Sequence, residues 1–111
     1  METHEEDTQV NTATCVAKHI DGWRGHTKMY RLDPPATYQT YTWFFKRGLR
    51  VKKTSYVIVS AIKDGPEGEE TFIYPCDCYG NDKGPIEMRG SLRGTLDHEK
   101  VLLAAGYLVV L

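Results

Sequence analysis

The densest group of side chains that could do chemistry lies in one short stretch, at Arg89, Arg93, Asp97, His98 and Glu99. Two guanidinium groups beside the free backbone N–H groups of a helix start could hold an anion. A histidine between two carboxylates could also serve as an acid or a base. The stretch is therefore a possible ligand or anion corner, and an enzyme built on it requires His98 to be exposed in a concave pocket.

The alternative is that the same five residues are structural. In that interpretation the arginines pair with the carboxylates, Asp97 caps the helix and His98 fills the top of its apolar stripe. No metal site is expected, because adjacent helical side chains point about 100° apart and cannot converge on one ion.

A short C-terminal helix must position this corner. Asp97 is a good N-cap, with Thr95 as the alternative. An apolar stripe at helical spacing follows, formed by His98, Val101, Leu102 and Ala105. Gly106 suits the left-handed residue that ends a helix.

An aromatic and basic segment at residues 38–53 is the most specific surface feature. For a protein partner, the aromatic side chains could supply a buried anchor and the cations a polar rim. For a single-stranded nucleic acid, the aromatic side chains could stack on the bases while the cations neutralise the phosphates. A third interpretation is a solvated edge strand protected by lysines. The predicted partner-binding residues are Tyr41, Trp43, Phe45, Lys46, Arg47, Arg50, Lys52 and Lys53.

The cysteines do not suggest a metal site. Cys76 and Cys78 would share one face of a strand, but the CxxC spacing of a zinc knuckle is absent and the three cysteines make an odd count. We expect reduced thiols, and no metal or cofactor.

Strand patterns dominate the rest of the chain. Asp21-Gly22 predicts a two-residue hairpin turn, and Asp33-Pro34-Pro35 is expected to end the second strand. Residues 56–62 are apolar on both faces, which is typical of a central strand. Pro75 indicates that its strand lies at an edge or ends there. The expected strands are 13–20, 23–32, 38–45, 50–62, 70–77, a short one at 86–88, and 107–111.

These elements predict a single two-layer α+β domain at residues 13–111, with an antiparallel sheet of about five strands and one C-terminal helix. The sheet face away from the helix carries aromatics and must be covered by loops, by the N-terminal segment or by a partner. Residues 1–12 are polar and acidic, which predicts a flexible tail.

Overall composition excludes some classes of protein. The net charge is −1, with 14 basic and 15 acidic residues, so no global field favours DNA or an anionic membrane. No apolar run is long enough for a transmembrane helix and no leader is recognisable, so we expect a cytoplasmic protein without membrane contact. The oligomeric state is left open.

Several blocks in the same order resemble a group of small uncharacterised proteins of actinobacteriophages and their actinobacterial hosts. The blocks are residues 30–35, 56–61, 70–75, 91–99 and 105–107. The resemblance covers most of the chain after residue 22, and the 38–53 segment and Cys76-Asp77-Cys78 depart from it. It implies an accessory protein of a phage or prophage inside the host cell, and it implies no activity.

The leading functional hypothesis is a small non-enzymatic protein that binds a host or phage protein through the 38–53 hairpin. The alternative is a nucleic-acid-binding protein that uses the same hairpin. A small enzyme or ligand binder at the Arg89–Glu99 corner is a third class.

Overall fold

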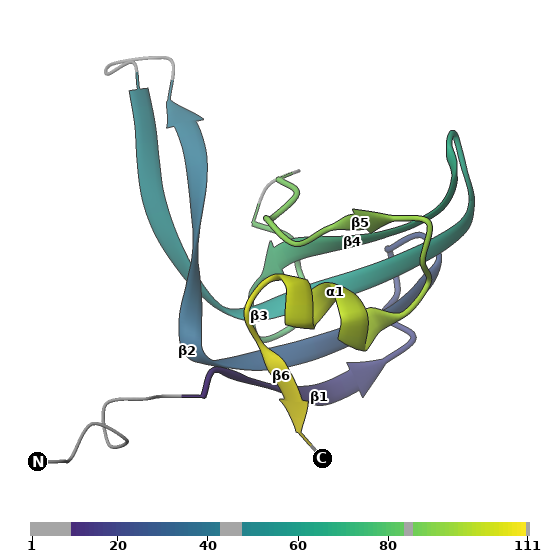
Figure 1. Ribbon diagram of the computed structural model, residues 1–111. Coiled ribbons are helices and arrows are strands. Elements are labelled where there is room, and N and C mark those ends of the chain that lie inside the picture. The colour runs from purple at the N-terminus through teal and green to yellow at the C-terminus, as the bar shows by residue number, and fades with distance from the viewer. Residues whose placement is uncertain (1–9, 43–47, 84–85, 111) are drawn as a thin grey trace, which may run out of the picture.

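The structure is a computed structural model that describes residues 10–42, 48–83 and 86–110. In these ranges the elements are β1 (Thr12–Lys18), β2 (His26–Thr42), β3 (Gly48–Gly65), β4 (Gly68–Cys76), β5 (Leu92–Arg93), α1 (His98–Ala104) and β6 (Leu108–Val110). The strands form one sheet in the order β5-β4-β3-β2-β1-β6, which curls into a half-barrel (Figure 1). The chain is thus a single, mostly β domain with one short C-terminal helix.

The sheet is mixed, which corrects the prediction of an antiparallel sheet of about five strands. The first strand, β1, pairs antiparallel with β2 on one side and parallel with β6 on the other, from Thr12 opposite Leu108 to Thr14 opposite Val110. Helix α1 lies between β5 and β6 in the chain, which are at opposite edges of the sheet, and the chain therefore crosses the sheet before β6 pairs with β1. The predicted single domain, the C-terminal helix and the last strand are confirmed.

The prolines at 34 and 35 do not end β2, contrary to the sequence-based prediction. Leu32 and Asp33 still pair with β1, whereas pairing with β3 stops at Arg31 and resumes at Ala36. The register shift leaves both prolines opposite no β3 residue, so their missing N–H groups interrupt no hydrogen bond between the strands.

Two other local predictions are also wrong. Residues 19–25 form the connection between β1 and β2, rather than a two-residue turn at Asp21-Gly22. The short strand expected at 86–88 is not a strand, although the Met88 N–H donates to the Ile73 carbonyl at 2.7 Å. The segment after it supplies β5 instead.

The central position of β3 is confirmed, since its inner half pairs with β2 and β4 at the same time. Val57, Ile58 and Val59 are fully buried, so both faces of the sheet are covered there. Pro75 lies near the end of β4, where β5 no longer runs beside it, as the sequence predicts.

Helix α1 begins and ends as its sequence predicts. The Asp97 carboxylate accepts from the backbone N–H groups of Glu99 and Lys100. At the other end Gly106 has a φ of 98°, and the N–H groups of Gly106 and Tyr107 donate to the carbonyls of Leu103 and Leu102. This is the Schellman arrangement, and it turns the chain directly into β6.

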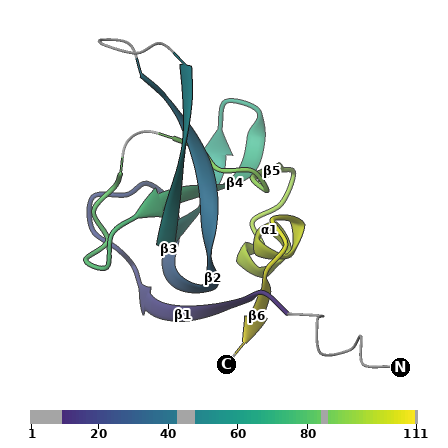
Figure 2. The ribbon, with the colours of Figure 1, turned by 90° about the vertical axis from the view of Figure 1, so that its left-hand side faces the viewer.

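The main core lies between α1 and the sheet, on a side that we call the helix face (Figure 2). Val101 and Leu102 of the helix pack there against residues of four strands, among them Tyr30, Val59 and Ile73. A smaller cluster on the opposite face joins Met29, Ile58 and Cys76 to residues of the 19–25 connection. The loops therefore cover only part of this second face, which we call the open face.

Candidate partner-binding arm and an aromatic hollow

The outer halves of β2 and β3 form a two-stranded arm, residues 36–42 and 48–54, that projects from the body of the sheet (Figures 1 and 2). Seven residue pairs join the two strands, from Ala36 opposite Thr54 to Thr42 opposite Gly48. At about 3.3 Å per residue the arm is roughly 23 Å long. Among the described strands, neither half pairs with a third, so both edges of the ribbon carry backbone groups without a strand partner.

Three of the predicted partner-binding cations lie on the β3 strand of the arm. Arg50, Lys52 and Lys53 are all exposed. Alternation places Arg50 and Lys52 on one face, as the sequence predicts, and Val51 on the other, where it is 65% exposed. The backbone of Tyr41 pairs with Leu49 in the arm. Trp43, Phe45, Lys46 and Arg47 lie outside the described residues, as do residues 1–9 of the predicted tail.

A hollow of about 660 Å³ separates the base of the arm from the helix face, and we call it the arm hollow. Tyr38 and Val51 of the arm border it, together with Met88, Arg89 and Tyr107. The Tyr107 hydroxyl donates to the Pro34 carbonyl at 2.8 Å, which ties the β2 bend to the end of α1. Burial raises the pKa of this hydroxyl, so it stays a donor across the physiological range.

The five residues of the predicted anion corner do not converge. Arg89 borders the arm hollow, whereas Arg93 lines a different hollow on the open face. Asp97 is occupied as the N-cap and Glu99 is exposed in the first turn. The cap at Asp97 matches the structural interpretation of the stretch, whereas Arg93 pairs with Glu67 and Glu70 rather than with Asp97 or Glu99.

His98 is a core residue, only 6% exposed. Its Nε2–H donates to the His26 carbonyl at 2.9 Å, and its ring meets that of His26 edge-on. Burial lowers the pKa of His98. The hydrogen bond to the His26 carbonyl opposes this shift, whereas electrostatic repulsion from Lys28 and from the His26 ring adds to it. His98 is therefore buried rather than exposed in a pocket.

The open face carries a second hollow, of about 680 Å³, which we call the aromatic hollow. Its floor includes Phe72 and Tyr74, two apart on β4, and Trp23 from the 19–25 connection lies against Tyr74. The ring centroids are 5.3 Å apart for Trp23 and Tyr74 and 6.0 Å apart for Phe72 and Tyr74. The Trp23 indole N–H donates to the Gly80 carbonyl at 3.0 Å, which fixes the ring in place.

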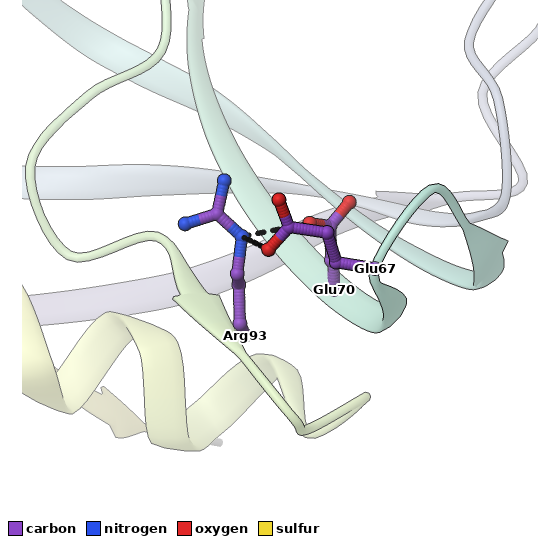
Figure 3. Close-up of polar contacts among 3 residues, drawn as sticks. All are labelled: Glu67, Glu70 and Arg93. Carbon is purple, nitrogen blue, oxygen red and sulfur yellow. Dashed lines mark hydrogen bonds and ion pairs between the residues drawn. The ribbon is translucent and has the colours of Figure 1, made fainter.

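One end of the aromatic hollow holds a guanidinium shared by two carboxylates (Figure 3). Nε of Arg93 lies 2.9 Å from Oε2 of Glu70 and 3.2 Å from Oε1 of Glu67. This pairing raises the pKa of Arg93. Figure 3 shows the two terminal guanidinium nitrogens pointing away from both carboxylates. Glu70 itself is only 4% exposed, so the contact with Arg93 is what stabilises its buried charge.

Gly65 makes the burial of Glu70 possible. A Cβ at this position would lie 2.6 Å from Oε1 of Glu70 and 2.9 Å from the Gly68 carbonyl. The tight connection between β3 and β4 therefore leaves room for the carboxylate only because residue 65 has no side chain.

The thiols of Cys76 and Cys78 lie in different environments and do not share one face of a strand, because β4 ends at Cys76. Cys76 is buried at the end of β4, and burial raises its pKa to about 12. Cys78 is exposed in the following turn, where the Asp77 carboxylate accepts from the backbone N–H groups of Tyr79 and Asn81. No group of three potential metal ligands occurs in the described part of the chain.

The aromatic hollow is the feature that sequence reasoning missed. Its signal was the alternation of Glu70, Phe72 and Tyr74 along one face of β4, which places all three on the open face. The partners Trp23 and Arg93 come from distant segments, and no local pattern connects them to β4.

Comparison with known proteins gives no match: no protein-family model, curated protein or solved structure matches the chain. The resemblance to small actinobacteriophage proteins therefore stays a prediction. Helix α1 has seven residues, and no helix in the described ranges is a candidate to span a membrane.

Proposed function

We propose that the protein is a non-enzymatic binding protein whose arm engages a protein partner. The observation that carries this proposal is the arm itself, a ribbon whose outer edges and cationic face have no partner among the described strands. An isolated two-stranded ribbon is marginally stable in water, so a projecting one gains stability when a partner covers it.

The chemistry of the arm supports a protein partner. Val51 exposes an apolar side chain beside the arm hollow, and the exposed Lys53, two residues further along β3, lies on the same face. An apolar contact with charged groups at its edge is usual for protein interfaces. Arg50 and Lys52 present further charge on the other face. The unpaired edges could also accept a strand from the partner, which adds backbone hydrogen bonds to the side-chain contacts.

The resemblance to actinobacteriophage proteins suggests where the partner is found. If the protein is a phage or prophage accessory protein, its partner is a host or phage protein in the cytoplasm of an actinobacterium. This part of the proposal depends on the resemblance alone.

Binding of nucleic acid by the same arm is the second candidate, favoured by the three exposed cations on β3. Phosphate contacts release counterions, so this function predicts a steep loss of affinity as the salt concentration rises. A protein interface centred on Val51 predicts a shallow dependence on salt.

The test is capture of partners from an actinobacterial lysate by the immobilised protein, with and without nuclease. The arm variant carries Arg50→Glu and Lys52→Glu. Its matched control carries Lys63→Glu and Lys100→Glu, which make the same change of charge at exposed positions outside the arm. A protein that survives nuclease, is lost with the arm variant and is kept by the control supports the proposal.

Two results contradict it. Recovery that disappears with nuclease favours the nucleic-acid function, and equal recovery by the arm variant and the control shows that binding does not use the arm.

A further inference from the structure

The aromatic hollow lies on the open face, whereas the arm hollow opens on the helix face, so a ligand of the aromatic hollow is independent of the proposed function. The volume of about 680 Å³ is within the usual range of small-ligand sites. The rings of Trp23, Phe72 and Tyr74 give the hollow a continuous aromatic wall, and polar and charged residues complete its lining.

We propose that the aromatic hollow binds a small organic cation, an alkylated ammonium group that packs against the rings of Trp23, Tyr74 and Phe72. Aromatic faces carry negative electrostatic potential and attract such cations, most strongly at tryptophan. The hollow is larger than the ammonium group alone, so the ligand carries further atoms.

The charges around the hollow favour a cation over an anion. Four carboxylates line it, against two guanidinium groups, Arg24 and Arg93. The carboxylates belong to Asp21, Glu67, Glu70 and Asp82. Because Glu67 and Glu70 share one guanidinium, their end of the hollow keeps an excess negative charge.

The experiment uses the fluorescence of Trp23. The chain has two tryptophans, so a Trp43→Phe background leaves Trp23 as the only reporter. Choline chloride is titrated against three controls: dimethylbutanol, which has carbon in place of the charged nitrogen, sodium acetate and sodium chloride. We expect a saturable change with choline, and an affinity roughly tenfold higher than for dimethylbutanol.

Variants in the same background locate the site. Phe72→Leu keeps an apolar side chain but removes one ring, and should weaken choline binding roughly two- to fivefold. Glu67→Gln should also weaken it, whereas Glu99→Gln makes the same change of charge on α1, away from the hollow, and should have no effect. Circular dichroism confirms that each variant is folded.

The proposal is overturned if choline gives no saturable change, if dimethylbutanol binds as tightly, or if acetate binds instead. It is also overturned if choline binds equally well to the Phe72→Leu and Glu67→Gln variants, because the cation would then occupy another surface.

Discussion

Thr54 lies where β3 leaves the body of the sheet and enters the arm, and we predict that its hydroxyl stabilises this junction. The side chain is 1% exposed. Its Oγ1–H can donate to the Tyr56 carbonyl at 2.7 Å or to the Cys76 carbonyl at 3.1 Å. The same oxygen accepts from Nζ of Lys83 at 3.3 Å, so one hydroxyl joins β3, the end of β4 and the loop after it.

Thr54→Val replaces the hydroxyl with a methyl group of similar size. The cavity stays filled, but the buried carbonyls lose their donor and Lys83 loses an acceptor. Leaving a buried polar group unsatisfied costs about 1–3 kcal/mol, and we expect the free energy of unfolding to fall by that amount. Thr54→Ser is the matched control, because it keeps the hydroxyl and should lose only about 0.8 kcal/mol for one buried methyl group.

The assay is urea denaturation followed by circular dichroism, with linear extrapolation to water. We expect the valine variant to be less stable than the serine variant. A valine variant as stable as wild type would show that the hydroxyl does not stabilise the junction. A serine variant less stable than the valine variant would show that packing of the methyl group matters more than the hydrogen bonds.

Three further predictions concern single side chains. Asp97→Ala removes the N-cap of α1 and should lower the free energy of unfolding by about 1 kcal/mol, whereas Asp97→Ser keeps a capping oxygen and should keep most of that stability. Urea denaturation measures the free energy of unfolding of both variants, and equal losses would contradict the capping role. Because the pKa of buried His98 is lowered in the folded protein, His98 is protonated in the unfolded chain first as the pH falls. The stability that neutral His98 contributes is therefore complete above about pH 6.5 and is lost as the pH falls below that value. Denaturation at pH 7.5 and 5.5 should show this loss in wild type and less of it in His98→Gln; an equal loss would assign the pH dependence to other groups. Iodoacetamide should label exposed Cys78 while Cys76 stays unmodified in the folded protein, because burial raises the pKa of the Cys76 thiol to about 12. Mass spectrometry of peptides distinguishes the two labelled cysteines, and early labelling of Cys76 would contradict its burial.

The features that sequence predicted well are those that short-range chemistry determines. The helix has a capping carboxylate at Asp97 and a glycine at 106, and both act within one turn of the residues they terminate. Residues 57–59 are apolar on both faces, and only a central strand buries both. In these places, local preference and tertiary structure agree.

The prolines at 34 and 35 mark the limit of such reasoning. Proline cannot donate to a neighbouring strand, and that local rule holds in the structure. The register shift between β2 and β3 removes the need for the donor, so the strand continues into the arm. Register depends on how two distant strands twist and pack, which the dipeptide itself does not encode.

The parallel pairing of β1 with β6 and the aromatic hollow were also beyond local patterns. Residues 12–14 and 108–110 are equally compatible with antiparallel and parallel pairing. The hollow depends on Trp23, Tyr74 and Arg93, which the chain brings together only when the connections around β4 fold over the open face. Convergence of this kind follows from topology rather than from spacing.

Hydrogen–deuterium exchange, of the protein alone and in complex with its captured partner, would show whether the arm is the partner-binding surface. Outward-facing amides of residues 36–42 and 48–54 have no strand partner among the described residues and should exchange rapidly in the free protein. We expect the partner to slow exchange in these two segments and to leave β4 and α1 unchanged. Protection confined to the open face or to α1, with the arm exchanging as before, would contradict a partner-binding arm.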